Sequence, residues 1–187
     1  QSATNITVAS TSVARGKYLY VYLKDSSGKA ISGQTINIKF NGRTYTRVTA
    51  SNGRVYLKIG SAAAKYTTKI TYAGNTSYKP SSKSFTLTVY KTKTNITVAS
   101  ASVIRGKYLY AYLKDSNGNP LASQSIKIKF YYSKYNYKYF YKTTDSNGRV
   151  YLKINSKPGY YTTKIIYSGS GYYQSYTKSF SLRSYVA

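Results

Sequence analysis

The chain has 187 residues, with 29 Lys and Arg against 3 Asp and Glu, and a formal net charge of +26. It contains no Cys and no His, which excludes disulfides, thiolate metal sites and histidine-based acid–base catalysis. Three acidic residues spread along the chain cannot converge on a calcium ion, and no run of about 18 apolar residues occurs. We therefore expect no enzyme activity, no metal, no cofactor and no transmembrane segment.

The sequence contains two copies of one unit. Residues 4–10 recur unchanged as 94–100, and residues 51–59 recur as 146–154. The offset grows from 90 to 95, so the second copy carries five additional residues between these blocks. A period near 90 residues suits one small β-domain. The repeat predicts one domain over residues 1–90, a short linker at 91–93 and a second domain over 94–187.

Alternation of apolar and polar residues with a period of two dominates each copy. In the first copy it predicts seven strands near residues 4–10, 16–24, 34–40, 43–50, 54–60, 65–73 and 82–90. The second copy repeats them at the offsets given above. In the second strand, Leu19, Val21 and Leu23 are expected to point inward and the tyrosines between them outward.

Glycine-containing segments separate these strands. Residues 25–28 and 115–118 each combine an Asp that can cap backbone amides with a Gly that allows positive φ. Asn52-Gly53 and Asn147-Gly148 suit tight hairpins. Seven short strands with turns every eight to twelve residues are typical of an immunoglobulin-like sandwich. The fold class predicted is all-β, with two tandem immunoglobulin-like domains.

Several segments resemble bacterial-type Ig-like (Big or invasin-like) repeats. They are KDSSGKAISGQ at 24–34, KDSNGNPLASQ at 114–124, and residues 72–78, 144–150 and 158–163. Such repeats occur in intimin- and invasin-like adhesins and in adhesin-like surface proteins of methanogenic archaea. The resemblance implies an extracellular, cell-surface or cell-wall location and a role as adhesin or stalk. It names no ligand.

The clearest difference between the copies is a tyrosine-rich hairpin in the second copy. Tyrosine supplies large contact area at a small entropic cost, and interleaved lysines suit an anionic partner. The candidate ligand-binding residues are Tyr131, Tyr132, Lys134, Tyr135, Tyr137, Lys138, Tyr139 and Tyr141. The alternative is an elongated hairpin whose rings only pack on lysine stems. A second group, the outward tyrosines near residues 18–22 and 108–112, is expected to stabilise the sheet, with a glycan platform as the alternative.

Two functions from different classes remain open. The first is a non-catalytic repeat segment of an adhesin that binds an anionic glycan, a cell-wall polymer or a host-cell surface. The second is a structural spacer that presents another adhesive domain. Specific nucleic-acid binding is weaker, because no nucleic-acid fold signature occurs. Asn5, Asn75 and Asn95 lie in glycosylation sequons, which would indicate an extracellular site if modified.

Overall fold

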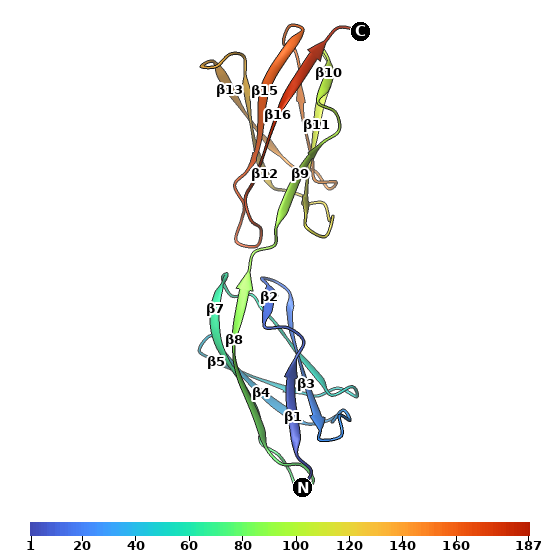
Figure 1. The fold of residues 1–187 in the computed structure, drawn as a ribbon, viewed down its shortest axis with the longest axis vertical. Coiled ribbons are helices and arrows are strands. Elements are labelled where there is room, and N and C mark those ends of the chain that lie inside the picture. Colours follow the sequence, from blue (N-terminus) through green and yellow to red (C-terminus); the bar gives the residue numbers. More distant parts are fainter. The chain divides into compact units, whose positions relative to one another are not determined.

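The computed structural model describes residues 1–187 and contains β-strands but no α-helix. The chain divides into two compact units, Gln1–Lys91 and Thr92–Ala187 (Figure 1). The all-β class predicted from the sequence is confirmed. No helix long and apolar enough to cross a membrane is present.

The first unit consists of two sheets. Its strands are β1 (Thr4–Val8), β2 (Ser12–Ala14), β3 (Tyr18–Asp25), β4 (Thr35–Phe40), β5 (Arg43–Val48), β6 (Arg54–Lys58), β7 (Ala64–Tyr72) and β8 (Ser81–Tyr90). The three-stranded sheet has the order β1-β3-β6, and the five-stranded sheet has the order β2-β8-β7-β4-β5. All neighbours are antiparallel except β2 and β8, which are parallel.

The second unit repeats this arrangement. Its strands are β9 (Thr94–Val98), β10 (Ser102–Ile104), β11 (Tyr108–Asp115), β12 (Ser125–Tyr131), β13 (Tyr137–Thr143), β14 (Arg149–Lys153), β15 (Gly159–Tyr167) and β16 (Tyr176–Tyr185). The sheets have the orders β14-β11-β9 and β10-β16-β15-β12-β13. In both units the chain repeatedly crosses between the two sheets, as in immunoglobulin-like sandwiches. The predicted fold of two tandem sandwiches is confirmed.

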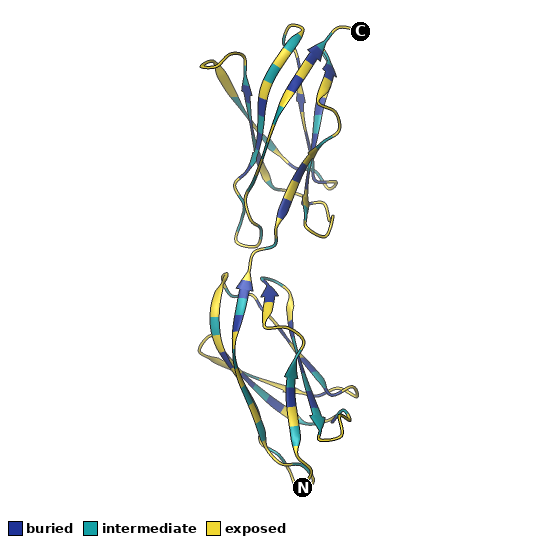
Figure 2. Ribbon diagram, in the orientation of Figure 1, coloured by how far each residue is buried: buried dark blue, intermediate teal, exposed yellow.

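The core of each unit lies between its two sheets, and buried residues alternate with exposed ones along the strands (Figure 2). In β3, the side chains of Leu19, Val21 and Leu23 are 0% exposed, as the alternation predicted. The first core also contains Ile36, Ile38, Phe40, Val55, Leu57, Ile70 and Leu87. Leu109, Leu113, Ile126, Ile128, Phe130, Leu152, Ile165 and Leu182 occupy the second core. Burial of one face of every sheet is the main source of stability in a sandwich of this size.

Two short strands were missed by the sequence prediction. The segment predicted as one strand, residues 4–10, ends at Val8, and the chain then changes sheets to form β2. The change occurs at Ser10, whose hydroxyl accepts a hydrogen bond from the Ser12 amide and donates one to the Ser12 carbonyl. Ser100 and Ser102 repeat these bonds before β10. Three-residue strands are too short to show alternation.

The prediction of tight hairpins at Asn52-Gly53 and Asn147-Gly148 was wrong. Strand β5 pairs only with β4, whereas β6 pairs only with β3 in the other sheet. The turn therefore takes the chain from one sheet to the other. In the second sheet, Val55 and Leu57 of β6 are buried in the core. The turn itself requires glycine: Gly53 has a φ of 72°, and a Cβ there would lie 2.5 Å from the Leu23 carbonyl oxygen.

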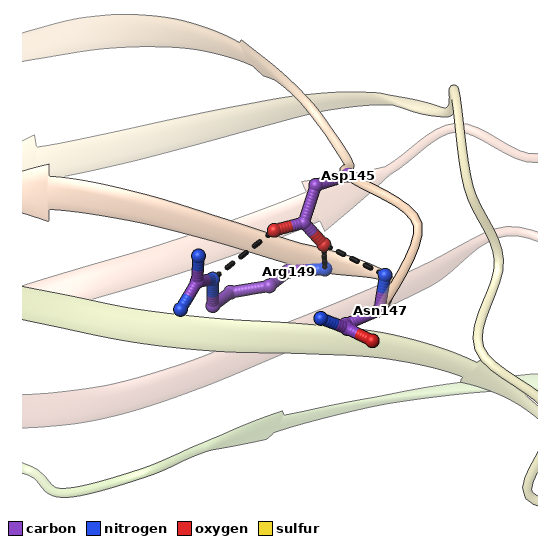
Figure 3. Close-up of polar contacts among 3 residues, drawn as sticks. All are labelled: Asp145, Asn147 and Arg149. Carbon is purple, nitrogen blue, oxygen red and sulfur yellow. Dashed lines mark hydrogen bonds and ion pairs between the residues drawn. The ribbon is translucent and has the colours of Figure 1, made fainter.

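In the second unit an aspartate fixes the same crossing turn (Figure 3). One carboxylate oxygen of Asp145 accepts hydrogen bonds from the amides of Asn147, at 2.9 Å, and Arg149, at 3.0 Å. The other oxygen lies 3.1 Å from the Arg149 Nε. The bond from the Arg149 amide is the main reason that the pKa of Asp145 is lowered. Asp145 therefore stabilises the turn, the role that the sequence analysis gave to the Asp residues at 25 and 115.

The five additional residues of the second copy extend the hairpin between β12 and β13. In the first unit, Asn41 and Gly42 form a two-residue turn with φ angles of 47° and 73°. Phe40 and Arg43 are the closing pair there. In the second unit the pairing continues to Tyr131 and Tyr137, and residues 132–136 form the loop. The extension lengthens each strand of this hairpin from six residues to seven.

Candidate ligand-binding face

The structure separates the predicted hairpin residues into two faces and a tip. Tyr131 of β12 and Tyr137, Tyr139 and Tyr141 of β13 share the outer face of the five-stranded sheet, because residues two apart on a strand point the same way. Their rings form a chain, with centroids 5.4 Å, 5.5 Å and 6.4 Å apart in succession. Half of the predicted residues are thus brought together.

The other four predicted residues do not lie on this face. Tyr132 packs edge-on against Phe130, with centroids 5.0 Å apart, and the Lys138 ammonium lies 5.2 Å from the Phe140 ring centre. Both side chains line a separate cavity of about 320 Å³ at the open edge between the sheets. Tyr135, which is 82% exposed, and Lys134 occupy the loop. One ligand on the outer face would not contact all eight residues.

Three lysines that the sequence analysis did not select complete the outer face. Lys129 lies next to three of the tyrosines, with its Nζ 3.8 Å from the Tyr137 ring centre, 4.8 Å from Tyr131 and 5.4 Å from Tyr139. Lys127 lies 4.8 Å from Tyr139, and Lys164 of β15 lies 5.9 Å from Tyr131. These distances are within the range of cation–π attraction. We call these three lysines with Tyr131, Tyr137, Tyr139 and Tyr141 the Lys/Tyr face.

The contacts with tyrosine favour the charged form of the central lysine. Hydrogen bonding with Tyr131 is the main reason that the pKa of Lys129 is raised, and the same interaction lowers the pKa of Tyr131. The rings also limit the positions that the Lys129 ammonium can adopt. A cation held in place loses less side-chain entropy when it binds an anion.

The Lys/Tyr face has unbalanced positive charge. Lys129 and Lys164 lie directly opposite each other on paired strands, where like charges destabilise a sheet. No acidic side chain lies on the face, because the only acids of this unit, Asp115 and Asp145, are at turns. A bound anion between the lysines would relieve this repulsion. Charge that is unfavourable in the free protein is a feature of functional sites.

The first unit provides a natural comparison. It has the same opposed lysines, Lys39 and Lys69, but these are exposed, whereas Lys129 and Lys164 are half-buried. The positions of Tyr139 and Tyr141 are taken by Thr44 and Thr46, as the register of the hairpins shows. Asn37 stands where the second unit has Lys127 and accepts a hydrogen bond from the Thr46 hydroxyl at 2.8 Å. The Lys/Tyr face is therefore a property of the second unit alone.

A second group of tyrosines lies on the three-stranded sheet of both units. Tyr18 and Tyr56 meet edge-to-face with centroids 5.6 Å apart, and Tyr108 and Tyr151 repeat this contact at 5.6 Å. The Arg54 guanidinium lies 5.0 Å from the Tyr20 ring centre. These contacts join β3 to β6 across the sheet and are the same in both copies. They agree with the predicted stabilising role of these residues.

A polar groove adjoins the Lys/Tyr face where β12 begins and β13 and β15 end. Its volume is about 510 Å³, which lies within the range of small-molecule sites. Lys127 and Tyr141 belong to both the face and the groove wall. The sequence analysis did not identify this groove, because its wall combines the base of the β12–β13 hairpin with residues at the end of β15, and only strand pairing brings them together.

Comparison with known proteins gives matches in structure only. No protein-family model and no curated protein matches the sequence. The fibronectin(III)-like modules of CbhA from Clostridium thermocellum are 12% identical, with a TM-score of 0.34, over 97% of this chain and 94% of that chain. A tetra-tandem repeat from the extending region of a large adhesion protein is 11% identical, with a TM-score of 0.41, over 97% and 48%.

Invasin, a bacterial integrin-binding protein, is 17% identical, with a TM-score of 0.41, over 98% of this chain and 39% of that chain. At such identities and TM-scores the likeness is limited to the fold and carries no argument about a ligand.

Proposed function

We propose that the chain is a non-catalytic, immunoglobulin-like repeat segment of an adhesin-type protein outside the cell. In this proposal the second unit binds an anionic polymer, such as an acidic glycan, a wall polymer or the glycan coat of a host cell. The observation that carries the proposal is the Lys/Tyr face: three lysines and four tyrosines with no acid among them, in one copy of an otherwise repeated domain.

The net charge and the face have different roles in this proposal. The formal charge of +26 attracts polyanions over long distances and raises their encounter rate, an effect that salt screens. The ammonium groups of the half-buried residues Lys127, Lys129 and Lys164 would make the direct charge-assisted contacts. The tyrosine rings add contact area at a small entropic cost, which slows dissociation.

A spacer role is the second candidate function, and the first unit favours it. That unit has a complete core and the same stabilising tyrosine contacts on its three-stranded sheet, but threonines replace the outer-face tyrosines. A spacer needs stability and solubility and no binding face. The two functions are compatible if the first unit holds the second unit away from an anchoring surface.

A charge-matched comparison tests the binding function. In one variant Lys127, Lys129 and Lys164 are changed to Gln. In the control Lys39, Lys65 and Lys69, on the outer face of the corresponding sheet of the first unit, are changed to Gln. Both proteins lose three positive charges, so bulk attraction falls equally in each.

Binding to immobilised heparin is then measured for both variants at about 0.15 M salt, where screening acts beyond about 8 Å. The proposal predicts that the Lys/Tyr-face variant loses most of its affinity while the control keeps most of it. Equal losses would mean that only bulk charge attracts the polymer, and the spacer function would then be preferred.

A further inference from the structure

The polar groove beside the Lys/Tyr face is lined by more hydroxyl groups than the corresponding positions of the first unit provide. In the second unit its wall carries the hydroxyl groups of Ser123, Ser125, Thr143 and Ser168. At three of the corresponding positions the first unit has residues without a hydroxyl, namely Gly33, Val48 and Ala73. The second unit therefore has three hydroxyl groups around this groove that the first unit lacks.

These hydroxyl groups are not used in hydrogen bonds within the protein. The side chains of Ser123, Ser125, Thr143 and Ser168 are exposed and make no hydrogen bond to another protein group. The neighbouring Gln124 and Thr144, in contrast, are engaged: Tyr167 donates to the Gln124 side-chain oxygen at 2.7 Å, and Thr144 donates to the Leu121 carbonyl at 2.6 Å. Free hydroxyls thus line a groove whose supporting residues are fixed.

Ser123 is held in a backbone conformation that serine rarely adopts. Its φ is 57°, in the left-handed region, and the corresponding residue of the first unit is a glycine, Gly33, with a φ of 68°. A side chain at this position disfavours the observed backbone, and no hydrogen bond of the Ser123 hydroxyl compensates for it. A Cβ at Gly33 would meet no atom within 4 Å, so the side chain has open space. Strain that persists without an internal benefit indicates a function outside the fold.

The remaining wall of the groove supplies a ring and a charge. Tyr141 is 75% exposed and replaces Thr46 of the first unit, whereas Lys127 replaces Asn37. Lys142 also lines the wall, but its ammonium lies 5.7 Å from the ring centre of Tyr151 in the three-stranded sheet. An exposed aromatic ring, several hydroxyl groups and the Lys127 ammonium match a sugar ring that has an apolar face, several hydroxyls and one acidic substituent. Tyr141 is the one exposed ring in the groove wall, whereas single-stranded nucleic acid is bound by several successive stacking rings.

We infer that the groove binds one residue of an acidic saccharide. In this inference the apolar face of the sugar packs on Tyr141, its hydroxyls bond with Ser123, Thr143 and Ser168, and its carboxylate or sulfate group contacts Lys127. The inference rests on the proposed function, which it deepens by naming the ligand class. The Lys/Tyr face then holds further acidic groups of the same polymer.

The test uses the full chain and isothermal titration calorimetry with four probes at one ionic strength. Tetragalacturonate presents carboxylates on sugar rings, and a heparin tetrasaccharide presents sulfates. Linear tetraphosphate presents charge without a sugar, and an oligothymidylate presents phosphates with bases. The groove variant combines Ser123→Gly, Thr143→Val and Ser168→Ala, which installs the residues that the same fold already contains in the first unit.

We expect one of the two acidic saccharides to bind more tightly than tetraphosphate and the oligothymidylate. The groove variant should weaken that saccharide about tenfold or more, because each hydroxyl contributes a hydrogen bond, and should leave tetraphosphate unaffected. Tyr141→Thr should give a similar loss. Changing Lys129 and Lys164 to Gln should weaken every anionic probe.

Different failures identify different errors. Unchanged saccharide affinity in the groove variant would overturn the groove inference, while a loss in the Lys129 and Lys164 variant would leave the proposed function standing. If neither variant changed the affinity, both would be wrong. Tighter binding of the oligothymidylate than of either saccharide would replace the saccharide with a nucleic acid. If the melting curve shows that the groove variant is unfolded, the saccharide affinity of Tyr141→Thr tests the groove inference instead.

Discussion

Replacement of Ser123 by glycine should make the second unit more stable, although it removes a side chain. The φ of 57° places Ser123 in the left-handed region, which costs a residue with a Cβ about 1–2 kcal/mol. Glycine removes this cost but adds about 0.4–1 kcal/mol of conformational entropy to the unfolded chain. The net expectation is that Ser123→Gly raises the free energy of unfolding by about 0.5–1 kcal/mol.

The reciprocal change, Gly33→Ser in the first unit, should lower stability by a similar amount, because Gly33 has a φ of 68°. Hydrogen exchange read by mass spectrometry measures both effects in the full chain, since the slowest amides of β4 and β12 report the opening of their own units. A loss of stability in Ser123→Gly, or none in Gly33→Ser, would refute the claim that Ser123 is strained. The saccharide affinity of Ser123→Gly should fall while its stability rises.

Three further predictions concern the fold and its turns. Leu19→Ala should cost about 2–5 kcal/mol in urea denaturation, since Leu19 is 0% exposed, whereas Tyr20→Ala, on the opposite face, should cost less; the reverse order would contradict the assignment of faces. Gly148→Ala should destabilise the second unit far more than Gly118→Ala. Both glycines have positive φ, but only at Gly148 would a Cβ clash, 2.4 Å from the Leu113 carbonyl oxygen. Similar melting temperatures of the two variants would exclude this clash. The pKa of Asp145 is lowered in the fold, so the stabilising effect of its carboxylate is present above its unfolded pKa near 3.8 and is lost as the pH falls through the folded pKa. Asp145→Asn should therefore reduce the dependence of unfolding free energy on pH in the acidic range. An unchanged dependence would mean that other groups cause it.

Much of the fold could be predicted from the sequence because its pattern is local. The alternation around Leu19, Val21 and Leu23 identifies a strand and its buried face without knowledge of its neighbours. The repeat then transfers each assignment to the second copy. The strands β2 and β10 were missed because three residues carry no periodic signal. The crossing turn at Asn52-Gly53 was misread because the same residues also suit a hairpin.

The candidate site was only half predictable, for a related reason. Composition identified the hairpin, but alternate residues of a hairpin lie on opposite faces, so Tyr132 and Lys138 separate from the Lys/Tyr face. Lys129 and Lys164 meet only because β12 pairs with β15, and this pairing joins segments far apart in the chain. An alignment of the two copies could have indicated the groove, because it shows that hydroxyl-bearing residues replace Gly33, Val48 and Ala73 in the second copy.

The central claim is that the second unit, and not the charge of the whole chain, recognises an anionic polymer. It is tested most directly by recording backbone amide chemical shifts of the full chain while a heparin tetrasaccharide is added at about 0.15 M salt. The account predicts saturable shifts in β12, β13 and β15, with the corresponding strands β4, β5 and β7 unaffected. Shifts of equal size spread over the lysines of both units would contradict it.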